Sequence, residues 1–194
     1  MKDIRICFLG DSFVNGTGDE EALGWTGRLC ADARKKGHEV TCYNLGVRRN
    51  TSRDVLLRWQ SEVALRLPGE VDGRIVLSCG VNDTVIERGI PRVPLMESIE
   101  NVRELLLGAE SFPRILIGPP CVGEDRQNRR IQELSSAYAA LAADLQIPFI
   151  DLFAVFRDDE AFIQEISAND GFHPGAVGYS KMADRILQSS HWWF

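Results

Sequence analysis

Three residues of this sequence have the types and surroundings needed for nucleophilic acyl transfer. Ser12 follows the apolar run Ile4–Leu9 and a glycine, so its hydroxyl would lie at the carboxyl end of a strand, where open α/β proteins bind their ligands. Serine is a weak nucleophile at neutral pH and needs a general base within hydrogen-bonding distance. His173 could be that base, because Asp170 precedes it by three residues in a loop and could orient its ring through Nδ1–H.

Each of these motifs also has a simpler explanation. Gly-Asp-Ser is a common turn composition, so Ser12 could merely cap a turn or a helix. A loop histidine beside an aspartate could be a surface ion pair. The other two histidines are weaker candidates for a base, because His38 follows two lysines and a glycine at a predicted helix end and His191 is among the last four residues.

A further polar motif, Gly80-Val81-Asn82-Asp83, directly follows the apolar run Arg74–Cys79. The side-chain amide of Asn82 could donate a hydrogen bond to a developing oxyanion, a contribution of about 3 kcal/mol per donor in acyl-transfer sites. Taken alone, the motif could equally be an Asn-Asp turn. Its position after a buried strand, like that of Ser12, makes it a candidate for the same site.

Alternating strand-like and helix-like segments predict an α/β fold. Apolar or β-branched runs, typical of parallel strands buried on both faces, occur at Ile4–Leu9, Glu39–Leu45, Arg74–Cys79, Arg114–Gly118 and Pro148–Leu152. Amphipathic segments with helical spacing occur at Trp25–Lys36, Arg53–Leu67, Leu95–Leu107, Arg126–Leu145 and Ala176–Leu187. The alternation predicts right-handed crossovers and a three-layer α/β/α sandwich with a five-stranded parallel sheet.

The order of the strands decides whether the polar motifs meet. In the common order 2-1-3-4-5, the first strand lies between the second and third, so the loops after those strands flank Ser12. Two further loops, Gly89–Pro94 and Val122–Asn128, contain glycine, proline or clustered charges near strand ends. We expect both to shape the mouth of a pocket.

Length and charge exclude several classes of function. A chain of 194 residues can form one domain with a substantial core, and we predict a single domain over residues 1–194. The formal net charge of -6 argues against nucleic-acid binding, which needs a clustered positive face. No stretch approaches the roughly 20 apolar residues that span a bilayer, and the amino terminus lacks the pattern of a secretory signal.

The five cysteines are widely scattered and form no C-x-x-C pair. We therefore expect reduced thiols in a cytoplasmic protein. Cys7, Cys42 and Cys79 lie in apolar strand-like runs, where a free cysteine packs as a small apolar side chain.

Four blocks of the sequence, in this order and spacing, resemble those of the GDSL or SGNH hydrolase family: Gly10-Asp11-Ser12, Asn44-Leu45-Gly46, Gly80-Val81-Asn82-Asp83 and Asp170-Gly171-Phe172-His173-Pro174. The resemblance covers nearly the whole chain, and its first and last blocks are the more specific. It implies a flavodoxin-like sandwich and a GDSL-type serine hydrolase, lipase or esterase that acts on small carboxylic esters or thioesters. It implies no metal or organic cofactor.

The resemblance also implies a role for particular residues. Ser12, His173 and Asp170 would form the catalytic triad. The oxyanion hole would consist of the backbone N–H of Ser12, a backbone N–H from the Gly46–Asn50 loop and the side chain of Asn82. Further candidates for substrate binding around this hole are Asp11, Gly46 and Arg49.

The second block departs from the family pattern, which places a glycine where this chain has Arg49. A backbone N–H survives the change, but a conformation that only glycine adopts freely would be strained with arginine. Arg48 and Arg49 could also face the pocket and favour an anionic acyl or leaving group. The simpler interpretation is a pair of solvated loop arginines.

Two other functions are compatible with the same residues. An acyl-enzyme can be discharged to an alcohol, which would make the protein an acyltransferase. A non-catalytic flavodoxin-like module could instead hold a phosphate or flavin at the Gly10–Gly18 loop, although this loop lacks both the dinucleotide glycine spacing and a P-loop lysine. The oligomeric state is left open, a homodimer included. The aromatic segment His191–Phe194 is expected to pack against the body of the protein.

Overall fold

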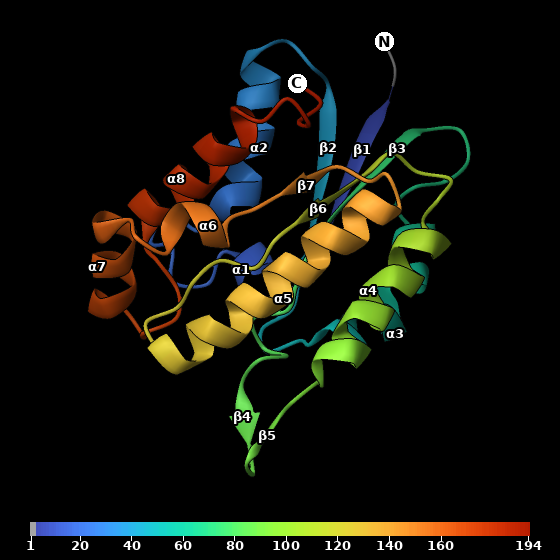
Figure 1. Ribbon diagram of the computed structural model, residues 1–194. Coiled ribbons are helices and arrows are strands. Elements are labelled where there is room, and N and C mark those ends of the chain that lie inside the picture. The colour runs from blue at the N-terminus through green and yellow to red at the C-terminus, as the bar shows by residue number, and fades with distance from the viewer. Residues whose placement is uncertain (1–2) are drawn as a thin grey trace.

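A five-stranded parallel sheet forms the centre of the computed structural model, which describes residues 3–194 (Figure 1). Met1 and Lys2, which belong to the predicted domain 1–194, lie outside the described residues. The strands of this sheet are β1 (Ile4–Gly10), β2 (Val40–Gly46), β3 (Asp72–Ser78), β6 (Arg114–Ile117) and β7 (Phe149–Ile150). Their order, β2-β1-β3-β6-β7, confirms the predicted 2-1-3-4-5 order, because β4 (Ile86–Glu87) and β5 (Ile90–Pro91) form a separate antiparallel hairpin.

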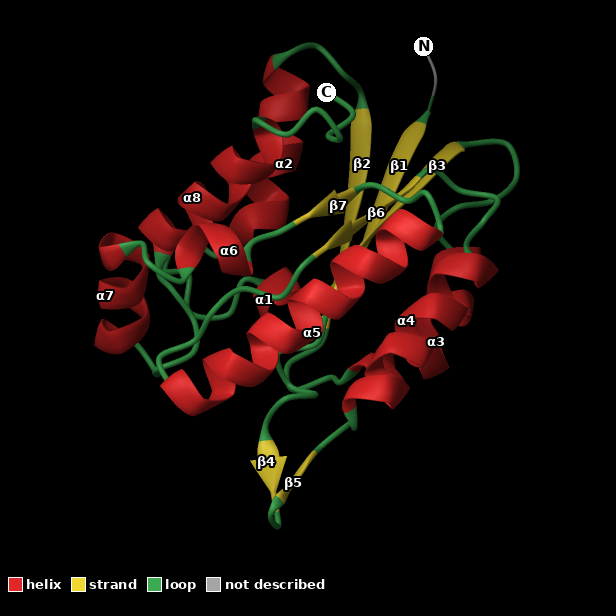
Figure 2. Cartoon of the chain, viewed as in Figure 1, coloured by secondary structure: helices red, strands yellow, loops and turns green. Residues whose placement is uncertain are grey.

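Helices cover both faces of the sheet, which confirms the three-layer sandwich (Figure 2). The longer helices are α2 (Gly24–Lys35), α3 (Ser52–Ala64), α4 (Leu95–Gly108), α5 (Asp125–Asp144) and α8 (Ala176–Leu187). The shorter ones are α1 (Ser12–Asn15), α6 (Phe153–Phe156) and α7 (Glu160–Ala168). Residues of α2, α6, α7 and α8 share one apolar core, and residues of α3 and α4 share the other. The long helix α5 contributes to both.

The pleat of β1 explains why its residues are apolar without interruption. Ile6 and Phe8 belong to the core on one face, whereas Cys7 and Leu9 belong to the core on the other. Successive strand residues point to opposite faces, so a strand covered on both sides needs apolar residues at every position.

The start of α3 follows from a capping box. The Thr51 hydroxyl accepts from the Asp54 backbone N–H, and the Asp54 carboxylate accepts from the Thr51 N–H, which satisfies two backbone donors that a helix start leaves free. The predicted helix ran to Leu67, but α3 ends at Ala64 and a turn covers the remaining residues.

Several short elements were not predicted from the sequence. The helix α7 begins after Asp159, whose carboxylate accepts from the Phe162 backbone N–H, and the β4–β5 hairpin pairs only two residues of each strand. The segment Val122–Asn128, predicted as a loop, contains the start of α5 at Asp125.

The prediction that all five cysteines are reduced is wrong. Cys30 in α2 and Cys42 in β2 form a disulfide with their Cα atoms 6.6 Å apart. The helix packs directly on that strand, a proximity that the spacing of the two residues in the sequence does not reveal. Cys7, Cys79 and Cys121 are free and buried.

The aromatic residues at the carboxyl end pack against the body of the protein, as predicted. Trp192 is buried, and Trp193 and Phe194 contact the same core. The Arg74 guanidinium lies over both of their rings, 5.3 and 5.0 Å from the centroids.

Between residues 3 and 194 the structure contains no helix with the length and apolar character required to traverse a bilayer.

Candidate active site

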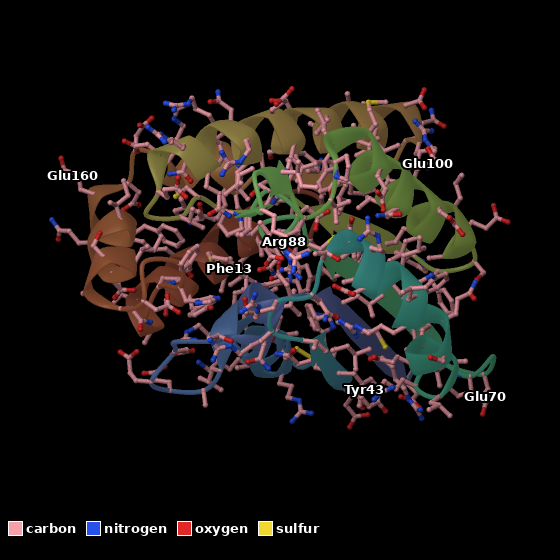
Figure 3. The ribbon with its side chains drawn as sticks, turned by 90° about the horizontal axis from the view of Figure 1, so that it is seen from below. Phe13, Tyr43, Glu70, Arg88, Glu100 and Glu160 are labelled. Atoms are coloured by element: carbon pink, nitrogen blue, oxygen red, sulfur yellow. A yellow bond between two sulfur atoms is a disulfide. The ribbon has the colours of Figure 1, made fainter. Side chains whose placement is uncertain are left out.

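The predicted site residues gather at the carboxyl edge of the sheet, which Figure 3 shows from below with Phe13 and Arg88 near its centre. β1 pairs in register with both neighbours, Gly10 lying opposite Gly46 and Ser78. A Cβ atom at Gly10 would lie 1.9 Å from the Ser78 carbonyl oxygen, so only glycine fits where β1 ends. This close pairing places the loops after β1, β2 and β3 side by side.

The structure brings Ser12, His173 and Asp170 into one chain of hydrogen bonds. Ser12 Oγ lies 2.7 Å from His173 Nε2, and His173 Nδ1 lies 2.7 Å from Asp170 Oδ2. Ser12 and His173 are both buried. With Nδ1 protonated and bonded to Asp170, Nε2 is free to accept the serine proton, which is the arrangement of a nucleophile, a general base and an orienting carboxylate.

Asp170 is held in place by its own loop. Its Oδ1 accepts hydrogen bonds from the backbone N–H groups of Phe172 and His173 at 2.9 and 2.8 Å. Partial burial alone would raise the pKa of Asp170, but the hydrogen bonds from the backbone and ring of His173 outweigh it and lower this pKa. The carboxylate therefore stays ionised beside the imidazole.

Asp11 starts the short helix that carries the nucleophile. Its Oδ1 accepts from the Phe13 backbone N–H at 2.9 Å, which makes it the N-cap of α1 and leaves Ser12 as the first helical residue. The N–H of a first helical residue has no partner within the helix. Asp11 is 1% exposed, and this burial raises its pKa to about 7.

Asn82 connects the loops after β1, β2 and β3. Its Nδ2 donates to the Asn50 carbonyl oxygen at 3.0 Å and to Asp11 Oδ2 at 3.4 Å. The long second bond is the weaker of the two. A negatively charged oxygen bound next to Ser12 would compete with Asp11 for this amide hydrogen.

The hydrogen bonds of the loop 46–50 narrow the choice of a backbone donor. The N–H of Gly46 donates to Asn44 Oδ1, and that of Asn50 donates to the Val47 carbonyl oxygen. Within the described chain, the N–H groups of Arg48 and Arg49 have no such acceptor. Arg49 has a φ of 65°. This is the left-handed conformation that glycine adopts freely and that is strained for arginine, as expected from the sequence.

Arg58 of α3 fixes this loop to the sheet. Its Nη2 donates to the carbonyl oxygens of Gly10 and Leu45, both at 2.9 Å, and its Nε donates to Asn50 Oδ1 at 2.8 Å. A single guanidinium therefore joins the ends of β1 and β2 to the residue whose carbonyl orients Asn82.

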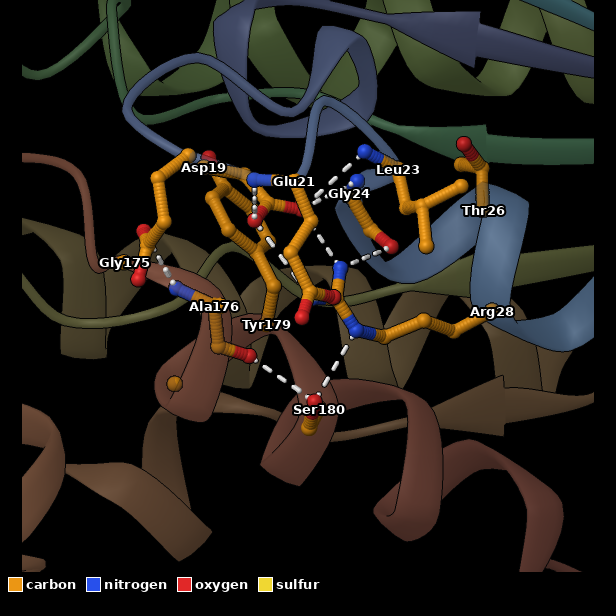
Figure 4. Close-up of polar contacts among 12 residues, drawn as sticks. Asp19, Glu21, Leu23, Gly24, Thr26, Arg28, Gly175, Ala176, Tyr179 and Ser180 are labelled. Atoms are coloured by element: carbon orange, nitrogen blue, oxygen red, sulfur yellow. Dashed lines mark hydrogen bonds and ion pairs between the residues drawn. The ribbon is translucent and has the colours of Figure 1, made fainter.

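A polar cluster around Asp19 and Arg28 joins the segment after Ser12 to α8, the helix that follows His173 (Figure 4). The buried Asp19 carboxylate accepts from the Gly24 N–H at 2.7 Å and pairs with Arg28. Arg28 Nε in turn donates to Ser180 Oγ at 2.9 Å, on the helix that follows His173. The Tyr179 hydroxyl donates to the Thr17 carbonyl oxygen at 2.7 Å. These contacts tie the segment after Ser12 to the segment after His173.

A cavity of about 280 Å³ opens onto the nucleophile. Its polar lining consists of Ser12, Asn82, Asp170, His173 and three arginines, and its apolar lining consists of Phe13, Val81, Val85 and Phe172. The lining includes Arg49 but neither Gly46 nor Asp11. Arg92, from the predicted loop Gly89–Pro94, lines it as expected, whereas no residue of Val122–Asn128 does.

Larger cavities of about 660 and 620 Å³ lie elsewhere, and their linings contain neither Ser12 nor His173. In residues 3–194, no three His, Cys, Asp or Glu side chains are grouped so as to hold a metal ion.

Sequence reasoning assigned no individual role to three residues that support the site, namely Arg58, Arg92 of the predicted pocket loop and Asp83 of the Asn82 motif. The Asp83 carboxylate is 1% exposed and accepts from the Ser52 N–H at 2.8 Å and from the Ser98 hydroxyl. Desolvation raises the pKa of Asp83. Its position next to Asn82 was the available signal, but its partners on α3 and α4 lie 31 and 15 residues away.

The sequence matches known proteins over most of its length. A model of the GDSL-like Lipase/Acylhydrolase family matches residues 8–181. An isoamyl acetate-hydrolyzing esterase of Saccharomyces cerevisiae is 27% identical over 162 residues, covering 70% of this chain and 68% of that protein. An acetylxylan esterase of Geobacillus stearothermophilus is 25% identical and covers 95% of this chain and 92% of its own.

The fold is also shared with solved structures. The crystal structure of a lipase/acylhydrolase from Enterococcus faecalis has a TM-score of 0.79 and 27% sequence identity, covering 97% of this chain and 94% of that one.

Proposed function

The chain belongs to the GDSL-like lipase/acylhydrolase family and is a serine hydrolase of ester bonds, and from this premise we propose that Ser12 forms a covalent acyl-enzyme. The observation that supports this is the continuous chain of hydrogen bonds from Asp170 through His173 to Ser12, both 2.7 Å long, at the wall of the cavity. The alternative of a non-catalytic binding module is not supported by this family membership.

In the proposed acylation step, His173 Nε2 takes the hydroxyl proton as Ser12 Oγ attacks the ester carbonyl carbon. The carbonyl π electrons move to the oxygen, which becomes an oxyanion. When the tetrahedral intermediate collapses, the C–O bond to the alcohol breaks and the imidazolium returns the proton to the departing alkoxide. Water then repeats the sequence with the acyl-enzyme and releases the acid.

The oxyanion requires donors that are already in place. We propose the Ser12 backbone N–H, the Asn82 amide and an N–H of Arg48 or Arg49 for this role. Asn82 keeps its 3.0 Å bond to the Asn50 carbonyl oxygen and gives the oxyanion the hydrogen that now makes the 3.4 Å bond to Asp11. Losing so long a bond costs little, whereas the new bond to a charged oxygen is strong.

The size of the cavity supports a short acyl group. A volume of about 280 Å³ falls at the lower limit of typical small-molecule sites. The two relatives are named for the hydrolysis of isoamyl acetate and acetylxylan, both of which are acetate esters. We propose that this chain likewise removes a small acyl group from an alcohol.

We further propose that residues 1–194 form one hydrolase domain. A cytoplasmic location also stays a proposal, and the disulfide between Cys30 and Cys42 removes the part of its support that came from reduced thiols.

Hydrolysis of 4-nitrophenyl acetate by wild type, Ser12→Ala and His173→Ala tests the proposed function. We expect both variants to lose at least 10³-fold in kcat, by analogy with the loss of triad members in other serine hydrolases. The matched control is Ser167→Ala, an exposed serine on α7, which should keep full activity. Substantial activity in a folded Ser12→Ala protein would rule out the proposed nucleophile.

A further inference from the structure

The cavity next to Ser12 is lined by arginines to a degree that ester hydrolysis alone does not require. Arg48, Arg49 and Arg92 all line it together with Ser12 and His173. We propose that the enzyme prefers esters that carry an anionic group, a carboxylate or a phosphate, close to the scissile carbonyl. This inference rests on the proposed function and specifies its substrate class.

The three guanidinium groups are only partly neutralised. Arg49 and Arg92 share one carboxylate, that of Glu87, and each is 3.4 Å from the same oxygen. Arg48 makes no hydrogen bond or ion pair with its side chain to any residue in the described range. Glu87 is not part of the lining, and the carboxylate that is, Asp170, is engaged with His173. The lining itself therefore holds three guanidinium groups and one carboxylate, while Asp54 and Asp83 also lie within the electrostatic reach of Arg92.

Arg92 is held in position rather than solvated. Its Nη1 donates to the Arg49 carbonyl oxygen at 3.0 Å, and its side chain is 19% exposed, compared with 78% for Arg49. It belongs to the segment that follows the β4–β5 hairpin, whose tip residue Arg88 lies near the centre of the edge in Figure 3. A fixed, half-desolvated guanidinium at the wall of a cavity is suited to bind a carboxylate or phosphate.

The lining of the cavity suits an ester that carries an anionic group near its scissile carbonyl. The apolar side chains of Phe13, Val81 and Val85 suit the short carbon chain between the scissile carbonyl and the charged group. If the anionic group of the substrate lies about 6 Å from one guanidinium, at an effective permittivity of about 40, Coulomb attraction strengthens its binding roughly tenfold. An anion on either the acyl or the alcohol side would gain from this attraction.

Paired esters test the proposal and locate the anion. On the acyl side, methyl hydrogen succinate is compared with methyl butyrate, because the poor methoxide leaving group prevents intramolecular attack by the free carboxylate. On the alcohol side, 3-carboxyphenyl acetate is compared with phenyl acetate. Each ratio of kcat/KM is divided by the ratio of the hydroxide-catalysed rates. In one of the two pairs, we expect wild type to prefer the anionic ester at least tenfold. This preference should decrease with added NaCl, which screens the attraction between charges.

Variants distinguish charge from structure. Arg48→Gln and Arg92→Gln should each lower the preferred ratio about five- to tenfold, mainly through a higher KM for the anionic ester, whereas Arg92→Lys keeps most of it. The control Arg185→Gln removes an equal charge from an exposed position near the end of α8 and should leave both ratios unchanged.

Three results would overturn the proposal. If wild type hydrolyses neutral esters through Ser12 but shows no preference in either pair, the substrate class is wrong and the proposed function stands. If the ratio is the same in Arg48→Gln and Arg92→Gln as in wild type, the arginines do not select the substrate. A protein that hydrolyses none of the four esters contradicts the proposed function itself, and with it the substrate class.

Discussion

Replacing Asp11 with asparagine should stabilise the protein at alkaline pH much more than at acid pH. Burial raises the pKa of Asp11 from 3.8 to about 7. Between these values the folded state holds a proton that the unfolded state has lost, so wild-type stability falls as the pH rises from about 4 to about 7. At about 1.4 kcal/mol per pKa unit, the loss is about 4 kcal/mol.

The substitution changes little else around this carboxyl group. The amide oxygen can still accept from the Phe13 N–H, as Asp11 Oδ1 does at 2.9 Å, so the start of α1 is preserved. The amide nitrogen would face Asn82 Nδ2 and lose the 3.4 Å contact. This contact is one of the interactions that lower the pKa of Asp11, so its effect is already contained in the raised value of about 7. The pH dependence of the stability difference therefore reports the ionisation of Asp11 in its buried surroundings.

Urea unfolding at pH 4 and pH 8.5 measures this difference. The free energy of unfolding of Asp11→Asn relative to wild type should rise by about 4 kcal/mol between the two pH values, or roughly 8–16 °C in Tm for a domain of this size. Asp184→Asn, which changes an exposed carboxylate on α8, is the control and should show no comparable rise. An equal stability difference at both pH values would show that burial does not raise the pKa of Asp11.

Three further predictions concern the oxyanion hole, the strained loop and the disulfide. Asn82→Ala should lower kcat by about 10²–10³ with the fold retained, measured by ester hydrolysis and circular dichroism; an unchanged kcat would exclude Asn82 as a donor. Arg49→Gly should raise the free energy of unfolding by about 1 kcal/mol, because glycine adopts a φ of 65° without strain; a loss of stability would contradict this. Replacing both Cys30 and Cys42 by serine should cost about 3 kcal/mol, from the chain entropy of a loop of 12 residues, and equal stability in urea with and without a reductant would contradict that figure.

The sheet and the long helices could be predicted because their signal is local. Apolar residues on both faces of β1 and the helical spacing of α3 depend only on neighbouring positions, and the strand order followed from the commonest arrangement of such units. Short elements carry too few residues for such a signal. The β4–β5 hairpin is an example, since Ile86 and Ile90 are both exposed and no apolar periodicity marks it.

The candidate site likewise contains residues with a local sequence signal and residues whose role depends on the folded chain. Ser12, Asp170, His173 and Asn82 could be found because each belongs to a compact motif next to a strand end. Arg58 and Arg92 could not, because an arginine in a helix or loop looks like any other until the chain folds and brings it to the Gly10 and Arg49 carbonyl oxygens. The Cys30–Cys42 pair was missed for a similar reason, since it depends on the packing of α2 against β2.

The most direct test of Ser12 as the nucleophile is the reaction of the protein with a fluorophosphonate probe, followed by intact mass measurement and peptide mapping. This reagent reacts with an activated serine whatever the natural substrate. We expect one probe per chain, attached to Ser12, with labelling lost in His173→Ala. A folded wild-type protein that is not labelled, or is labelled at a different serine, would contradict the assignment of Ser12 as a nucleophile activated by His173.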